Sequence, residues 1–244
     1  MSYRAIIEID ETGTTTISET EINHLTRVRR VREGTEFLGL SLKEGTWYQC
    51  RLIRKNKNWG VKRLSAQPGS RESTLHIQLA CALLKKDKME WVIQKACELG
   101  VNTIVPIVSE HVEPAVSRRF QKNQSRLKKI ILESVKQCGR TKVLYLDPLA
   151  QLDDFISQHR GNQTIVLDEA GGISLETCLQ DLKTQPSDIT LLVGPEGGWS
   201  QRDRASFQAA NVTRANLGTR IIRAETASVA GVAILQYMYG DLRP

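Results

Sequence analysis

The chain has 244 residues with 34 basic and 27 acidic side chains, and its formal net charge is +7. This length suits one large domain or two moderate ones. No apolar run approaches the roughly 18 residues of a membrane span, and the N-terminus lacks the apolar core of a signal peptide, so we expect no membrane association. Five cysteines, odd in number and without a CxxC pair, predict neither a disulfide framework nor a zinc site. Four scattered histidines offer no metal-ligand spacing. We therefore predict no metal and a cytoplasmic location.

Basic residues gather in three parts of the chain. The first group is Arg27, Arg29, Arg30 and Arg32, the second lies between residues 51 and 63, and the third lies between residues 118 and 142. A single charge run is usually a solvated face. Three groups in one chain favour a phosphate backbone as a partner.

The N-terminal part reads as short strands separated by turns. The expected strands are 3–9, 14–17, 35–42, 46–53 and 60–64, with one helix-like piece at 21–30. Many short strands at close spacing predict a small barrel. The polar segment 66–74, which carries Pro68 and Gly69, is the expected joint between two domains, 1–70 and 71–244.

Strands and helices alternate from residue 75 onward. We expect strands at 75–84, 102–108, 142–146, 163–167, 189–193 and 212–217. A helix that Asp87 caps, with Glu90 completing a capping box, is expected to end at Gly100. Further helices are expected at 123–138, 150–159, 173–183, from Ser200, and at 227–239. This pattern predicts an α/β domain with a mostly parallel sheet and helices on both faces.

Two glycine-bearing loops follow apolar strands near the C-terminus. The first reads GPEGGWS over 194–200, and the second begins at Leu217 and Gly218. Glycine permits positive φ and lets a ligand approach the main chain closely. No Gly-Lys-Ser/Thr closes the first loop, so it is not a Walker phosphate loop. Paired loops at strand ends predict a small-molecule site.

Arg223 and Glu225 place charges at the start of an apolar helix that we expect to be buried. They could form a local ion pair with only a structural role. Beside a glycine loop, they are also candidates for chemistry.

These residues resemble the RsmE family, RNA methyltransferases of the SPOUT superfamily. GPEGGWS and LGTRIIRAETA resemble the family's paired cofactor loops, with Ile222 and Ala224 in place of Leu and Thr. The segment LACALLKKDKMEWVIQKACELGVNTIVPIVSE resembles a second family signature, in which His111 stands where arginine is usual. Residues 137–140 and the His24–Arg30 segment match further motifs more loosely, so the resemblance covers nearly the whole chain.

The resemblance implies a PUA-like RNA-binding barrel followed by a SPOUT α/β domain tied in a trefoil knot, and a homodimer. It implies S-adenosylmethionine (SAM) as methyl donor and N3 of a uridine in 16S ribosomal RNA as acceptor. The donor would lie among loops 167–172, 194–198 and 217–223. The implied cofactor-binding residues are Leu167, Gly194, Pro195, Glu196, Gly197, Gly198, Leu217, Gly218, Ile221, Ile222 and Arg223, and the implied RNA-binding residues are Arg4, His24, Arg27, Arg29, Arg30 and Arg140.

The acceptor nitrogen carries an imide proton that must leave. An arginine near the uracil oxygens would stabilise the developing anion, and Arg223 is the candidate. Glu225 could take the proton, directly or through water. Glu196 could do the same, although we favour its pairing with backbone N–H groups of its own loop. Two alternatives remain: a methyltransferase acting on another RNA position, such as a ribose 2′-hydroxyl, or a non-catalytic RNA-binding assembly factor.

Overall fold

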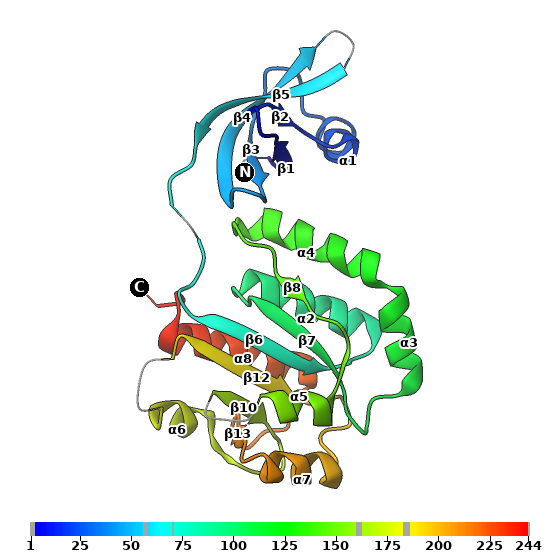
Figure 1. Ribbon diagram of the computed structural model, residues 1–244, viewed down its shortest axis with the longest axis vertical. Coiled ribbons are helices and arrows are strands. Elements are labelled where there is room, and N and C mark those ends of the chain that lie inside the picture. The colour runs from blue at the N-terminus through cyan, green and yellow to red at the C-terminus, as the bar shows by residue number, and fades with distance from the viewer. Residues whose placement is uncertain (1–2, 56–57, 70, 160–162, 183–185, 244) are drawn as a thin grey trace. The chain divides into compact units, whose positions relative to one another are not determined.

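A computed structural model describes residues 3–55, 58–69, 71–159, 163–182 and 186–243 (Figure 1). The chain forms two compact units. The first comprises residues 1–72 and 133–143, and the second comprises residues 73–132 and 144–244. The structure therefore adds a segment of the later chain to the first unit, which was expected to end near residue 70.

The first unit is a nearly closed small β-barrel. Its strands are β1 (Arg4–Ile9), β2 (Thr15–Thr16), β3 (Glu36–Ser41), β4 (Thr46–Lys55) and β5 (Asn58–Ala66). They follow the order β2-β1-β3-β4-β5, and β2 returns close to β5. Among the described strand pairs of this unit, β1–β3 alone is parallel. Alternating side chains such as Ile7, Phe37 and Leu52 fill the interior, and the predicted barrel is confirmed.

The expected helix at 21–30 consists of two short pieces. Helix α1 (Glu19–Asn23) is capped by Ser18, and it continues into a π-helical turn, η1 (His24–Val28). Leu25 points into the barrel core, whereas Arg27, Arg29 and Arg30 are exposed. The wider turn brings an arginine-rich segment to the surface of the barrel.

A buried ion pair holds the segment 133–143 within the first unit. The Arg140 guanidinium donates to Glu72 Oε2 at 2.8 and 3.0 Å, and the two side chains are 4% and 8% exposed. Backbone N–H groups of Thr141 and Lys142 donate to the other oxygen of Glu72. Burial raises the pKa of Glu72, but these donors outweigh that effect and the net pKa is lowered.

The second unit contains an eight-stranded parallel sheet. The strands are β6 (His76–Ala82), β7 (Thr103–Val108), β8 (Tyr145–Leu146), β9 (Ala150–Gln151), β10 (Thr164–Leu167), β11 (Ile173–Ser174), β12 (Asp188–Val193) and β13 (Thr213–Asn216). Their order is β11-β13-β10-β12-β6-β7-β8, and β9 also pairs with β7. Every pairing is parallel, as predicted.

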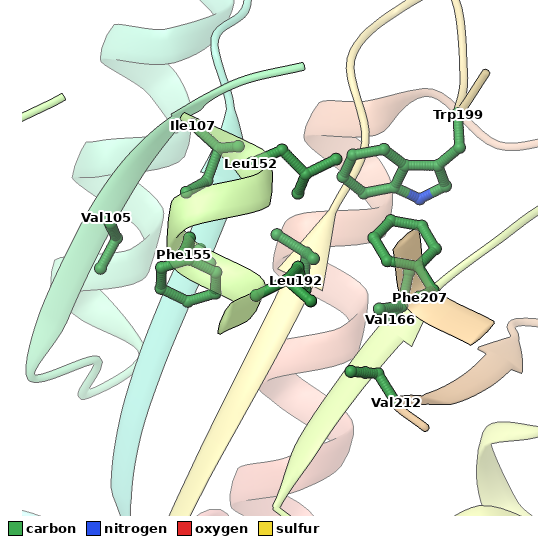
Figure 2. Packing of buried hydrophobic residues seen from close by; sticks show 11 residues of the cluster. Val105, Ile107, Leu152, Phe155, Val166, Leu192, Trp199, Phe207 and Val212 are labelled. Carbon is green, nitrogen blue, oxygen red and sulfur yellow. The ribbon is translucent and has the colours of Figure 1, made fainter. Parts of the chain in front are cut away.

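Helices cover both faces of this sheet. The helices of the C-terminal part are α2 (Lys86–Glu98), α3 (Pro114–Lys122), α4 (Gln124–Cys138), α5 (Leu152–Gln158), α6 (Leu175–Gln180), α7 (Gln201–Ala209) and α8 (Ala224–Tyr239). Helices α5 and α7 pack on one face, where Phe155 and Phe207 meet Leu192 and Val166 (Figure 2). On the other face α8 approaches so closely that Gly231 abuts Leu191. No helix in the described part of the chain is long and apolar enough to cross a membrane.

Several expected elements differ from the structure. Asp87 does not cap α2: the backbone of Lys85 occupies the N-cap, and the Glu90 carboxylate binds Arg126 instead of reaching back. The strand expected at 142–146 pairs only at Tyr145–Leu146, because the Lys142 N–H is bonded to Glu72 in the first unit. Helix α8 is not buried all round, since Tyr237 is 60% exposed.

Helix α3 was not expected at all. It lacks a capping side chain, and the signal that marks its start is Pro114 in the first turn. The capping box predicted at Ser200 and Asp203 is confirmed, with N···O distances of 3.0 and 2.9 Å.

Candidate functional site

Three loops meet at one edge of the parallel sheet. Strands β13, β10 and β12 are neighbours, and each ends at this edge. The loops that follow them cover residues 168–172, 194–200 and 217–223. Carboxyl ends of adjacent parallel strands are the usual place for a ligand in an α/β fold.

The loops enclose a cavity of about 640 Å³, which we call the donor cavity. This volume lies in the range of small-molecule sites, ~300 to 1,000 Å³. Each residue that the sequence assigned to cofactor binding lines this cavity: Leu167, Gly194, Pro195, Glu196, Gly197, Gly198, Leu217, Gly218, Ile221, Ile222 and Arg223. The structure also places Lys88, Asp168, Glu169, Asn216 and Arg220 in the lining.

Two glycines of the loop 194–200 have no room for a side chain. A Cβ at Gly194 would lie 3.0 Å from the Trp199 ring, and one at Gly198 would lie 2.4 Å from a Glu169 oxygen. Gly198 also has a φ of +69°, in the left-handed region that favours glycine. The loop therefore exposes its main chain to the cavity.

Trp199 fixes this loop to the end of the neighbouring strand. Its indole N–H donates to the carbonyl oxygen of Leu167 at 2.8 Å, and its ring packs edge-on against Phe207. The side chain is 2% exposed. A buried hydrogen bond thus joins the loop after β12 to the end of β10.

The side chain of Asp168 fixes the start of the loop that follows β10. The Asp168 carboxylate is fully buried and pairs with Arg204 at 3.0 Å and Arg214 at 2.7 Å. Burial raises the pKa of Asp168, but the hydrogen bonds from Arg204, Ala170 N–H and Arg214 outweigh it, so the net pKa is lowered. Asp168 is therefore an ionised anchor that joins β10, α7 and β13.

Lys88 joins two carboxylates at the wall of the cavity. Its Nζ lies 2.7 Å from Glu196 Oε1 and 3.4 Å from Glu225 Oε1. The hydrogen bond to Glu196 is the main cause of the raised pKa of Lys88, and the charges of Glu196 and Glu225 add to it. Glu196 thus pairs with a lysine, not with its own loop. Glu225 does not line the donor cavity, but Lys88 connects it to that cavity.

Arg223 stands at the N-cap of α8, lines the cavity and is exposed. The local ion pair considered between Arg223 and Glu225 is not formed, because Glu225 pairs with Lys88. Glu225 Oε2 is buried without a hydrogen-bond partner among the described residues. A buried carboxylate oxygen without a donor is costly, so this oxygen is available to a hydrogen-bond donor of a bound ligand.

The residues assigned to RNA binding lie in the first unit but in different environments. Arg27, Arg29 and Arg30 are exposed, and Arg29 donates to the His24 ring at 3.5 Å. Arg4, His24 and Arg29 line a cavity of about 340 Å³ with Lys136. The Arg4 guanidinium also donates to the carbonyl oxygens of Lys136 and Gln137.

Arg140 is the exception among these residues. It is buried in its pair with Glu72 and does not face solvent. Its position makes it a structural residue of the first unit, so the expectation that it contacts RNA is not supported.

Sequence reasoning missed Lys88 as a site residue. It stands in the run KKDKME, where three lysines follow one another closely and nothing in the local pattern singles it out. No group of histidine, cysteine or acidic side chains that could hold a metal occurs within the described ranges.

The chain matches two protein families. Residues 71–236 match the RNA methyltransferase domain, and residues 17–58 match the RNA methyltransferase PUA domain. It is 31% identical to ribosomal RNA small subunit methyltransferase E of Aquifex aeolicus, over 90% of this chain and 92% of that protein. It is 26% identical to the protein of the same name from Bacillus subtilis, over 97% and 94% of the two chains.

Two solved structures resemble the whole chain. A ribosomal RNA small subunit methyltransferase E from Neisseria gonorrhoeae, bound to SAM, superposes with a TM-score of 0.85 at 25% identity and covers 100% of both chains. A methyltransferase from Legionella pneumophila, in complex with bound SAM, gives a TM-score of 0.87 at 28% identity and covers 99% of this chain and 100% of that one.

Proposed function

Because the chain belongs to the ribosomal RNA small subunit methyltransferase E family, we propose that it uses SAM to methylate RNA of the small ribosomal subunit. The observation that carries the proposal is the donor cavity, which three loops at adjacent strand ends enclose. The acceptor that we propose is N3 of a uridine in 16S RNA, as the resemblance of the paired loops implies. A ribose 2′-hydroxyl is the alternative acceptor.

The residues of the donor cavity fit SAM. Leu167, Leu217 and Ile222 offer apolar walls for the adenine, and the main chain at Gly194, which lines the cavity, offers backbone hydrogen-bond groups. Glu169 and Glu196 also line the cavity, where they pair with Arg204 and Lys88, and their carboxylates offset part of the positive charge of a sulfonium and an ammonium group. When bound, SAM supplies an electrophilic methyl group on a positively charged sulfur.

The chain's own residues would prepare the acceptor. Glu225, whose Oε2 is buried and unpartnered among the described residues, accepts the proton from N3. Arg223 donates to a uracil oxygen and stabilises the negative charge that this proton leaves behind. The target base must be extruded, because N3 is occupied in a paired uridine.

An Arg223→Ala variant tests this role. We expect its turnover to fall about 100-fold, the usual loss for one donor to a developing anion. The measurement is single-turnover methyl transfer to small subunits at saturating SAM, with SAM affinity measured separately by calorimetry. Wild-type turnover with normal donor affinity would remove Arg223 from the chemistry.

We further propose that the units correspond to an RNA-binding domain, residues 1–70, and a methyltransferase domain, residues 71–244. The barrel and the exposed arginines of η1 support the first assignment. Since Glu72 binds Arg140 and the Glu21 carboxylate binds Lys136, a fragment that is to fold alone must include residues 133–143.

A trefoil knot in the second domain is part of the proposal. After β13 the chain returns across the sheet to α8, which packs over β12 and β6, and this return supports the proposal. We also propose a homodimer in the cytoplasm. Ile221 and Tyr237, 86% and 60% exposed, are apolar side chains that a second copy would cover. Sedimentation equilibrium measures the oligomeric state.

A calorimetric titration with SAM separates an enzyme from an assembly factor without a donor site. We expect one site per chain with a micromolar dissociation constant, and no binding would contradict the proposed function.

A further inference from the structure

A second cavity lies in the same unit as the donor cavity. It has a volume of about 610 Å³ and lies where the N-terminal end of α2 faces α3 and the start of α4. Its floor is apolar: Leu84, Met89, Phe120 and Leu127 line it and are all buried. The RNA-binding and donor-binding predictions leave this cavity unexplained.

Lys88 is the residue that lines both cavities. Its ammonium lies between Glu196 of the first glycine loop and Glu225 of α8, at 2.7 and 3.4 Å. The border between the two cavities therefore carries one cation and two carboxylates. A ligand that reaches from the second cavity toward the donor meets this group first.

The charges around the second cavity favour an anionic ligand. Lys85, Lys86 and Arg119 line it, and no side-chain hydrogen bond or close ion pair holds them in the described part of the chain. The charges of Lys86 and Arg119 also act on Glu90 and help to lower its pKa. The lining carboxylate of Glu90 is already neutralised by a two-bond pair with Arg126, at 2.7 and 2.8 Å. Asp87 and Glu113 are the remaining lining acids, both exposed. These three cations outnumber the two remaining carboxylates, and Lys88 is already paired with Glu196 and Glu225.

The apolar side chains of this cavity suit the base of a nucleotide, and the cations around them suit its phosphate. Extruded bases are held by apolar and aromatic side chains, and phosphates by lysine and arginine. A free metabolite such as the donor would not need three unpaired cations, because SAM itself carries positive charge.

We propose that this second cavity is the acceptor cavity: it takes the extruded target nucleotide, and Lys88 contacts a carbonyl oxygen of its base at the border with the donor cavity. The inference rests on the proposed function and deepens it. Lys88 acts as a hydrogen-bond donor to the base, because its two carboxylate partners keep it protonated. Glu225, on the other side of the ammonium, keeps the role of proton acceptor.

Matched variants on α3 test the cavity. Ala115 lines it, so Ala115→Trp fills it, whereas Gln121→Trp adds the same bulk on an exposed position of the same helix outside the lining. Arg119→Glu reverses a lining charge, and Arg118→Glu makes the same change on the neighbouring residue, which does not line the cavity. We expect each lining variant to raise KM for small subunits about tenfold more than its control, as for the removal of one favourable interaction with the RNA. SAM affinity by calorimetry should stay within about twofold for all of them.

Lys88 is tested by Lys88→Met and Lys88→Arg at saturating SAM. We expect Lys88→Met to lower kcat about 100-fold, and Lys88→Arg to recover part of it because a donor is restored. Small subunits carrying 4-thiouridine at the target position provide a readout besides activity. Ultraviolet cross-linking should attach the RNA to peptides that contain residues 84–90 or 113–127.

Equal effects of the lining and control variants, or cross-links only to other peptides, would overturn the acceptor cavity. Equal activity of Lys88→Met and wild type would overturn the role of Lys88. In each case the wild-type enzyme still methylates the subunit. If the wild type transfers no methyl group, the proposed function itself has failed, and the two failures are therefore distinct.

Discussion

The main chain at Gly198 lies so close to Glu169 that any side chain would collide with the carboxylate. Gly34 has a similar φ, +82° against +69°, but a Cβ there would meet nothing within 4 Å. A substitution at Gly34 therefore tests backbone strain alone. A substitution at Gly198 tests the same strain together with the loss of space beside the donor cavity.

We predict that Gly198→Ala weakens SAM binding at least tenfold, because the new methyl group displaces the Glu169 carboxylate, which lines the cavity. Gly34→Ala should cost about 1 kcal/mol of stability from the strain alone and leave SAM affinity unchanged. Calorimetry and urea unfolding measure both quantities. The same loss of affinity in both variants would show that the effect is global destabilisation.

Asp168 provides a pH-dependent contribution to stability. Its pKa is lowered in the folded chain, so its contribution is present above the unfolded pKa, ~3.9, and is lost as pH falls through the folded pKa. We predict that Asp168→Asn loses about 2 kcal/mol at pH 7. This difference from wild type should shrink below about pH 4.

The control for Asp168 is Asp153→Asn, since Asp153 pairs with Arg202 on the surface, with side chains 54% and 74% exposed. We expect its cost to stay within about 0.5 kcal/mol. Urea unfolding at several pH values measures both variants. A difference for Asp168→Asn that persists unchanged at pH 3 would contradict an ionised anchor.

At the level of elements, helix α7 begins directly after the first glycine loop. Ser200 and Asp203 cap each other's backbone N–H groups at this point. We predict that Ser200→Ala lowers the free energy of unfolding by about 1 kcal/mol and weakens SAM binding a few-fold, because the end of the loop loses its anchor.

Ser174→Ala is the matched control, since Ser174 caps α6 with a bond from Thr177 N–H and does not line the donor cavity. It should lower stability without changing SAM affinity. Denaturant titrations and calorimetry provide the comparison. If both variants changed SAM affinity equally, the cap of α7 would have no specific role in SAM binding.

The elements that sequence reasoning predicted are those with a local cause. The strands 189–193 and 163–167 are β-branched runs that end at turn signals, and the loops after them carry glycines whose role can be read in the chain. The individual donor-binding residues were implied by the family resemblance, and each of them lines the donor cavity.

Apart from helix α3, whose start Pro114 marks locally, the features that it missed depend on distant partners. Lys142 leaves the sheet because Glu72 binds its N–H, and Lys88 becomes part of the site because Glu196 and Glu225 approach it from other segments. The placement of Arg140 depends in the same way on Glu72. No periodicity or spacing reports such interactions, because they join segments far apart in the sequence.

At the scale of the whole molecule, two units of different chemistry share one chain. The barrel presents exposed arginines at 27, 29 and 30, and the α/β unit carries the donor cavity. We predict that reversing these three arginines to glutamate weakens RNA binding and lowers its salt slope by about 0.7 for each phosphate that the barrel no longer neutralises. SAM affinity should not change.

The control is a comparison of single reversals. Lys43→Glu changes the same charge in the barrel outside the three basic groups, and Arg29→Glu changes one arginine of the η1 segment. Filter binding at several salt concentrations measures both. If Lys43→Glu and Arg29→Glu weaken binding equally, net charge and not the η1 surface governs RNA affinity.

The proposed reaction of this chain is methylation of N3 of a uridine in small-subunit RNA. The most direct measurement incubates the purified protein with SAM and small subunits that lack the modification, digests the RNA to nucleosides, and identifies the methylated nucleoside by mass spectrometry. We expect one 3-methyluridine per subunit. A 2′-O-methylated nucleoside, or no methylated nucleoside at all, would contradict it.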